Sequence, residues 1–171
     1  MKKIIFSILF IIFCSTPVLA NLPHYLDFKF ILNESDAGKK AQTFLKKKLD
    51  NGFKSIKEKE NKILEEEKKI IQQKKIISSD EYRKKVSELR KKVSALQKER
   101  ESLLQNVAKQ RAKARETLLK NLNPILKNYM QENNVRVVID KKSILLADET
   151  LDLTKKIMDE LNKKLKNIKL D

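Results

Sequence analysis

Residues 49–77 read LDNGFKSIKEKENKILEEEKKIIQQKKII, and their apolar residues recur at a regular spacing. An aliphatic residue returns at every seventh position, and the members of this series are Leu49, Ile56, Ile63, Ile70 and Ile77. Leu64 and Ile71 widen the apolar stripe, and charged side chains fill most other positions. A period of about 3.5 residues over several heptads is typical of a coiled-coil helix. The stretch therefore predicts a long solvated helix with one apolar seam.

A second apolar stripe follows and steps along the chain by four and three residues. Its members are Tyr82, Val86, Leu89, Val93 and Leu96, and after Arg100 it resumes at Leu103 and Val107. Ser78, Ser79 and Asp80 lie between the two stripes and are favoured N-cap residues. We therefore expect a tip near 78–81, with residues 35–121 forming an antiparallel coiled-coil hairpin rather than one continuous rod.

The composition agrees with a helical protein. The 171 residues include only 2 Gly and 3 Pro, and 36% of them are charged. A β-sandwich, a Rossmann sheet or a loop-built enzyme would need more turn residues. The formal net charge is +16, and its excess is concentrated, because residues 39–121 hold 26 basic and 12 acidic side chains. A strongly basic middle segment is thus inserted between nearly neutral ends.

The ends of the chain carry strand patterns. Leu26, Phe28 and Phe30 alternate with polar or aromatic residues, which predicts a first strand. Residues 135–140 are rich in β-branched side chains and predict a second strand, and residues 144–147 predict a third. Asn123–Pro124 is expected to break or kink the second long helix between the hairpin and these strands.

Together with a last helix that residues 152–154 cap, these strands predict a small β-containing body built from residues 21–34 and 122–171. The fold class is α+β and mostly helical. So small a body leaves apolar strand surface open, and open strands pair with other chains. We expect oligomerisation through the residues Leu26, Phe28, Phe30, Val137 and Ile139.

The N-terminus has the features of an export signal. Lys2 and Lys3 precede an apolar run from residue 4 to residue 13, and Val18-Leu19-Ala20 provides the small or branched residues that signal peptidase needs. This pattern predicts a signal peptide, residues 1–20, cleaved after Ala20. A membrane anchor is the alternative, but the apolar run is shorter than the ~20 residues that a spanning helix needs. Cys14 is the only cysteine, so the mature chain would contain no disulfide.

The sequence contains no pattern typical of catalysis or of metal binding. His24 is the only histidine, and Asp140 and Asp148 lie near strand ends, where turn and cap roles are common. We therefore expect no catalytic residue, no metal and no cofactor, and we expect a protein that is not an enzyme. Export also argues against nucleic acid as the partner of the basic segment. The basic residues that we expect to contact an anionic partner are Lys74, Lys75, Arg83, Lys84, Lys85, Arg90, Lys91 and Lys92.

Two end segments carry a resemblance to a known family. The first is Tyr25-Leu26-Asp27 with residues 31–41 (ILNESDAGKKA). The second is residues 135–140 (VRVVID) with Leu146-Ala147-Asp148 and Asp152-Leu153-Thr154. With the order of elements, they make the mature chain resemble the Skp (OmpH-like) family of periplasmic chaperones. Leu146 departs from the pattern, because many members carry an aromatic residue there.

The resemblance implies a homotrimer in the periplasm, in which three hairpins project from a joint β-body. It implies an ATP-independent holdase that binds unfolded outer-membrane proteins and prevents their aggregation in transit. Lipopolysaccharide or an anionic membrane surface is a further candidate partner. The alternative function is a structural coiled-coil envelope protein that binds anionic lipid or lipopolysaccharide surfaces. The two differ in one respect, because only a chaperone prefers an unfolded client over its folded form.

Overall fold

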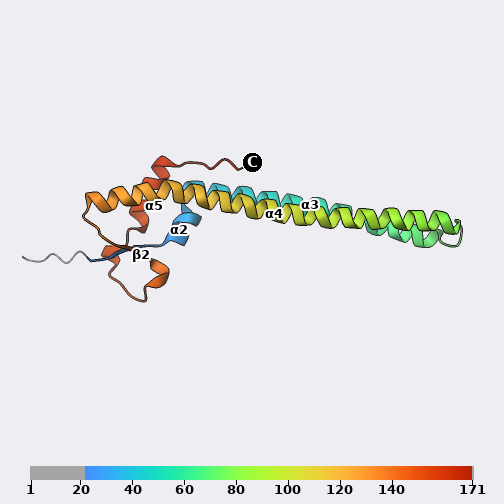
Figure 1. Cartoon of the computed structure of the whole chain (residues 1–171), viewed down its shortest axis with the longest axis horizontal. Coiled ribbons are helices and arrows are strands. Elements are labelled where there is room, and N and C mark those ends of the chain that lie inside the picture. Colours follow the sequence, from blue (N-terminus) through green and yellow to red (C-terminus); the bar gives the residue numbers. More distant parts are fainter. Residues whose placement is uncertain (1–21, 171) are drawn as a thin grey trace, which may run out of the picture.

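The computed structural model of the chain describes residues 22–170 (Figure 1). The expected signal peptide and its cleavage site after Ala20 lie outside these residues. The described part is mostly helical with a small strand region, as the sequence predicts. No helix within it is both long enough and apolar enough to cross a bilayer.

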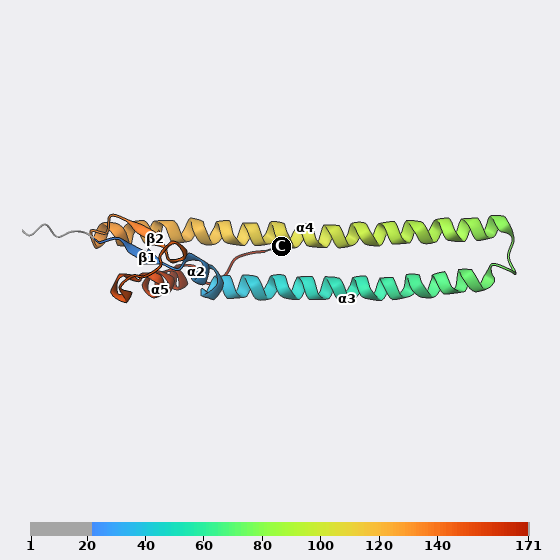
Figure 2. The same ribbon diagram turned by 90° about the horizontal axis from the view of Figure 1, so that it is seen from below.

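Two long helices dominate the molecule. Helix α3 spans Asp36–Gln73 and helix α4 spans Ser79–Glu132. Their lengths of 38 and 54 residues correspond to ~57 Å and ~81 Å at the rise of an α-helix. They lie side by side in opposite directions, and the chain reverses in the short segment between them (Figure 2). Ser78 begins the return, because its hydroxyl accepts a hydrogen bond from the backbone N–H of Glu81 at 3.2 Å.

We call residues 36–121, from the start of α3 to the middle of α4, the arm. Its seam consists of the predicted heptad residues, of which Ile56 and Ile70 are buried and Leu49, Ile63 and Ile77 are half-buried. Ion pairs cross the seam from Lys59 to Glu99 at 2.6 Å, from Glu66 to Lys92 at 2.6 Å and from Glu60 to Arg100 at 2.7 Å. Two helices alone give a thin core, so much of the arm's apolar surface stays in contact with water.

The expected break at Asn123–Pro124 does not occur. Pro124 lies inside α4, which continues to Glu132, so the expected body boundary at residue 122 falls within a helix. Pro124 itself is exposed, whereas Leu122 and Ile125 on either side are buried in the core. An interior proline removes one backbone donor and crowds the carbonyl four residues earlier, and burial of these two neighbours favours the helix in spite of that cost.

The body contains a two-stranded parallel sheet. Strand β1 spans His24–Leu26 and strand β2 spans Val138–Asp140, with Tyr25 opposite Ile139. The predicted second strand thus shortens to its last three residues. Tyr25 also bridges to Asp152, because the Leu153 N–H donates to the Tyr25 carbonyl at 2.8 Å.

Phe28 and Phe30 do not continue the first strand, contrary to the sequence prediction. They lie in helix α2, Phe28–Glu34. The carboxylate of Asp27 caps this helix by accepting a hydrogen bond from the Phe30 N–H at 2.7 Å. Because Ile31 is fully buried and Leu32 packs on the core, the segment has a helical apolar face that also fits the sequence. A local cap thus overrides an alternation of only three residues.

The expected third strand, residues 144–147, is also absent from the described chain. Two 3₁₀ turns flank it, η1 over Lys141–Ser143 and η2 over Glu149–Leu151. Leu145 and Leu146 project into solvent and are 106% and 92% exposed. A strand requires a neighbouring strand, and a single copy of this chain provides none at this position.

The core lies where α2 and the C-terminal half of α4 meet helix α5, Thr154–Lys164. Ile157 and Leu161 of α5 are fully buried. Gly38 permits α3 to approach the end of α2, because a Cβ there would lie 2.1 Å from the carbonyl oxygen of Leu32. The base of the arm is therefore fixed to the body by contacts of α3 with α2 and of α4 with α5.

Candidate functional site

The predicted basic residues gather at the far end of the arm. Lys74 and Lys75 lie in the reversal segment, and the other six lie in the first four turns of α4. All are exposed except Lys85, which is half-buried. The structure therefore brings Lys74, Lys75 and Arg83 together with Lys84 and Lys85 around one tip, about the length of α3 away from the body.

Not all of these cations are equally open to a partner. Lys92 forms the 2.6 Å ion pair with Glu66 across the seam, so it contributes to the arm itself. Arg83 lies 3.9 Å from Asp80 in a solvent-exposed pair, which contributes little. The Lys74 ammonium lies 5.8 Å from the centre of the Tyr82 ring, a cation–π contact that anchors the reversal segment. The tip thus presents a positive surface with a defined shape.

Apolar exposure accompanies the charge at the tip. Ile76 is 83% exposed in the reversal segment, between basic residues and the start of α4. Sequence analysis did not assign it a role, because the heptad pattern uses Ile77 instead. An exposed aliphatic residue that directly follows two lysines can contact apolar and anionic groups at the same time.

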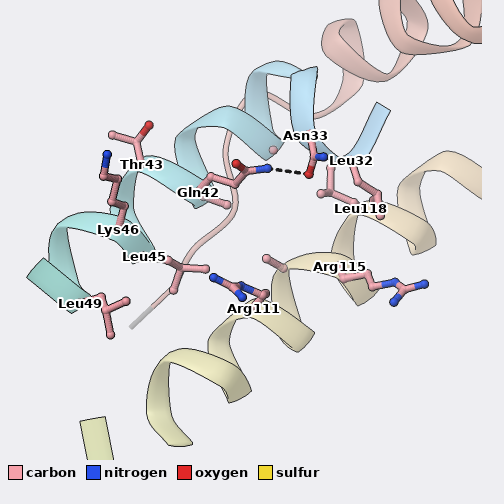
Figure 3. Close-up of a pocket in the computed structure, with 13 residues that line it drawn as sticks. Leu32, Asn33, Gln42, Thr43, Leu45, Lys46, Leu49, Arg111, Arg115 and Leu118 are labelled. Carbon is pink, nitrogen blue, oxygen red and sulfur yellow. Dashed lines mark hydrogen bonds between the residues drawn. The ribbon is translucent and has the colours of Figure 1, made fainter. Parts of the chain in front are cut away.

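Sequence analysis also missed a groove at the base of the arm, shown in Figure 3. Its volume is about 670 Å³, and residues of α3 and α4 with the end of α2 line it. Leu45, Leu49 and Leu118 give it an apolar wall, and Arg111 and Arg115 lie along α4 (Figure 3). The Gln42 amide donates to the Asn33 side-chain oxygen at 2.7 Å and ties α3 to α2 at its edge. The i,i+4 pair of arginines beside Ala114 was the available sequence signal.

The residues predicted to join subunits are not equally accessible in one chain. Phe30 and Val137 are 46% and 52% exposed. Phe28 and Ile139 are half-buried, and Leu26 is buried in the core of its own chain. The open apolar surface of the body therefore includes Phe30 and Val137 together with Leu22, Leu145 and Leu146.

The carboxylates near the strand ends have structural roles. Asp140 accepts from the Lys142 N–H at 3.3 Å, and Asp148 accepts from the Thr150 N–H at 2.9 Å and its hydroxyl at 2.8 Å. The hydrogen bonds from Thr150 lower the pKa of Asp148. Within residues 22–170, no group of three or more His, Cys, Asp or Glu side chains could hold a metal ion. These aspartates cap turns.

Comparisons with known proteins agree on one family. The family described as "Outer membrane protein (OmpH-like)" matches residues 24–161. A crystal structure of a candidate outer membrane chaperone (OmpH-like) from Caulobacter crescentus matches the chain with a TM-score of 0.81 at 20% identity. The match covers 91% of this chain and 92% of that chain, and at this identity it shows the fold. No curated protein matches the sequence.

Proposed function

The chain belongs to the OmpH-like family of outer membrane proteins, and from this premise we propose that it is an ATP-independent periplasmic chaperone. It holds unfolded outer-membrane proteins and prevents their aggregation on the way to the outer membrane. The protein binds its clients and catalyses no reaction on them. The proposal also includes export by the signal peptide, which is cleaved after Ala20.

One observation carries the proposal. The charge excess of residues 39–121 is displayed on a two-helix arm that extends far beyond a small packed body. A long basic arm with a thin core offers many weak contacts over a large surface. Such contacts keep an unfolded chain soluble without fixing its shape, and the positive field raises the rate of encounter with acidic clients.

The proposed assembly is a homotrimer. The body of one chain leaves Phe30, Val137, Leu145 and Leu146 in solvent, and residues 144–147 have the composition of a strand. Pairing of this segment with a neighbouring copy would cover these side chains and complete the sheet. Three arms on one body would multiply the weak contacts with a single client.

Light scattering tests the proposed function. An unfolded β-barrel protein is diluted from urea with and without residues 21–171 of the chain. A chaperone suppresses the rise in scattering and co-elutes with the client, whereas a folded barrel in detergent does not co-elute. Aggregation that proceeds unchanged in the presence of excess protein contradicts the proposal.

A second candidate function is a structural envelope protein that binds anionic lipid or lipopolysaccharide. The observation that favours it is the exposed Ile76 beside Lys74 and Lys75, since interfacial segments combine apolar and basic residues. Vesicle sedimentation separates the two functions. A linker binds anionic vesicles with the same affinity whether or not client is present, and it does not suppress client aggregation.

A further inference from the structure

The two broad faces of the arm differ in chemistry. On α3, Phe53, Leu64 and Ile71 are 39%, 51% and 59% exposed. Eleven residues separate the first two, and eighteen separate the first from the last. At 100° per residue these spacings place the three side chains within about 20° of one another around the helix. They form an apolar row beside the buried seam, along most of the outer arm, with Glu60 and Glu67 at intervening positions of the same stripe.

Helix α4 contributes to the same face. Val93 and Leu104 are 41% and 47% exposed and again stand eleven residues apart. A shallow groove of about 270 Å³ joins the two helices there, and both Leu64 and Val93 line it. The antiparallel register brings Leu64 level with Val93, and Phe53 level with Leu104. We call these five residues the apolar arm face: Phe53, Leu64, Ile71, Val93 and Leu104.

The opposite side of the seam carries more charged residues. A groove of about 450 Å³ there shares the seam residues Ile63 and Leu96 with the first groove. Its other lining residues, which we call the polar arm face, are Lys59, Lys62, Glu66, Lys92, Ala95 and Glu99. Two 2.6 Å ion pairs, Lys59–Glu99 and Lys92–Glu66, cross this face. The groove on the other side also contains one ion pair, Glu60–Arg100 at 2.7 Å, but the exposed apolar side chains of the apolar arm face have no equivalent among the residues of the polar arm face.

Basic residues lie at a regular spacing beside the α3 residues of the apolar arm face. Lys57, Lys68 and Lys75 each follow an α3 residue of that face by four positions. Side chains four residues apart are neighbours on a helix surface. Each apolar side chain of α3 is thus accompanied by an ammonium group within reach. This combination is complementary to a polypeptide that presents apolar side chains and carboxylates together.

We propose that the apolar arm face is the surface on which an unfolded, acidic outer-membrane polypeptide lies, and that the polar arm face does not contact it. The inference rests on the chaperone function proposed above and assigns it to one side of the arm. The α3 side chains of this face lie ~16 Å and ~10 Å apart. Side chains on one face of an extended strand repeat every ~6.8 Å, so the two periods do not match. No fixed register results, and the client exchanges between positions.

Charge argues against a second copy of the chain as the occupant. Residues 39–121 carry 26 basic and 12 acidic side chains, so two such faces in contact would bring like charges together. An acidic client removes that repulsion. A membrane surface is the other anionic and apolar candidate, and the experiment includes it as a competing outcome.

The first experiment places an environment-sensitive dye on either face. The chain without residues 1–20 contains no cysteine, so single-cysteine variants are specific. Leu64→Cys and Val93→Cys report the apolar arm face. Lys62→Cys and Ala95→Cys, two residues away on the same helices, report the polar arm face. We expect a blue shift of the dye on addition of unfolded acidic β-barrel client only at positions 64 and 93. An equal shift at all four positions, or a shift only at 62 and 95, overturns the assignment.

The second experiment removes the apolar side chains. Leu64→Gln, Val93→Gln and Leu104→Gln are combined in one variant, and Ala95→Gln, Ser102→Gln and Asn106→Gln form the matched control. We expect the first variant to bind client about tenfold more weakly and the control to bind normally, with equal helicity by circular dichroism. Equal affinity of the two variants overturns the inference.

The outcomes also separate this inference from the proposed function. If the unmodified protein suppresses client aggregation but all four dyes respond alike, the function stands and the face assignment fails. If the unmodified protein does not suppress aggregation, both fail. If the dyes at 64 and 93 shift with vesicles of anionic phospholipid but not with client, the occupant is a membrane and the inference is overturned.

Discussion

Gly52 of α3 lies so close to Leu103 of α4 that a Cβ on Gly52 would stand 2.4 Å from Leu103 Cδ2 and 2.7 Å from its Cδ1. Because the distances are shorter than carbon atoms tolerate, the leucine occupies the space that a larger residue would need. The absence of a side chain at Gly52 therefore lets Leu103 pack directly against the backbone of α3. Gly52 is also a residue of low helix propensity in the middle of a 38-residue helix.

These two properties predict that substitutions at positions 52 and 103 have strongly coupled effects on the free energy of unfolding. Gly52→Ala gains about 1 kcal/mol of helix propensity but forces Leu103 to move, so its net effect on the free energy of unfolding should be near zero. In a Leu103→Ala background the clash disappears, and the same substitution should stabilise by about 1 kcal/mol. Urea unfolding of the four proteins measures the coupling. Additive effects would contradict the close contact.

The sequence predicted the parts of the fold that rest on a long repeated pattern. The seven-residue series from Leu49 to Ile77 survives as the seam, since many turns average out local exceptions. An alternation of three residues, Leu26, Phe28 and Phe30, is too short to predict a strand reliably. The segment from Phe28 forms helix α2 instead, because Asp27 caps it. Residues 144–147 were unpredictable from one chain for another reason. A strand depends on a partner strand, and the described residues of one chain place none beside this segment.

In the candidate site, too, the sequence predicts some features and not others. The place of Lys74 and Lys75 at a tip followed from the turn signal at Ser78. The ion pair between Lys92 and Glu66 could not be predicted from the sequence, because it depends on the register between two helices. The two-sided character of the arm depends on the same register, so sequence analysis treated Leu64 and Ile71 as seam residues.

Asp152 should make the stability of the body depend on pH in acid. Its carboxylate accepts from the Thr154 N–H at 2.8 Å and pairs with Lys141 at 3.2 Å. Burial raises the pKa of Asp152, but the hydrogen bonds from Thr154 and the contact with Lys141 together lower it below its usual 3.8. A lowered pKa in the folded state means that the contribution is present above the unfolded pKa and is lost as pH falls through the folded pKa.

The corresponding variant is Asp152→Ala. At pH 7 it should lower the free energy of unfolding by about 1 kcal/mol, because α5 loses its capping acceptor. Urea titrations at decreasing pH should show the difference from the unmodified protein shrinking below pH 3.8. Asp159→Ala on the exposed side of α5 is the control and should change stability less at pH 7. A difference that grows in acid would contradict the assignment.

A charged substitution at Val137 should prevent the proposed trimer from forming. It is 52% exposed in one chain, so Val137→Asp leaves the fold of the chain intact. In the proposed trimer the carboxylate would be buried without a partner, which costs several kcal/mol. Analytical ultracentrifugation at micromolar concentration should give a trimer for the unmodified protein and a monomer for the variant. Phe28 is less suitable, since it packs on the core of its own chain.

Asn106→Asp, on the exposed surface of the arm, is the matched control and should remain trimeric. An unmodified protein that sediments as a monomer would exclude the proposed trimer. A Val137→Asp protein that stays trimeric would show that the subunits meet elsewhere on the body.

The basic tip should govern the rate of client capture. Exposed charges are screened over ~8 Å at physiological ionic strength and over ~3 Å in 1 M salt. Stopped-flow association with an acidic unfolded client should therefore slow about tenfold from low to high salt, with little change in the dissociation rate. Neutralising the five tip cations should reproduce part of this loss at low salt; these residues are Lys74, Lys75, Arg83, Lys84 and Lys85.

The control neutralises the same number of charges in and around the body. Its Lys→Gln substitutions are at Lys29, Lys127, Lys155, Lys164 and Lys169, all of which are exposed. If steering depends on the tip, this control captures client faster than the tip variant at the same net charge. Equal rates would show that only total charge matters, and an association rate independent of salt would exclude steering.

The outer arm should be removable from the body by a deletion that shortens both helices to the same level. The ion pairs Lys59–Glu99 and Glu60–Arg100 show that Ile56 and Ser102 lie at the same level of the arm. Deleting residues 57–101 thus removes matching lengths of both helices, and a linker of about four Gly and Ser residues spans the 8–10 Å between helix axes.

The core residues Ile31, Leu122 and Ile157 all lie outside the deletion, so the shortened protein should unfold cooperatively and keep its oligomeric state. It should fail to suppress client aggregation in light scattering, because the tip and most of the apolar arm face are gone. Suppression equal to that of the full chain would place client binding on the body or in the groove beside Arg111 and Arg115.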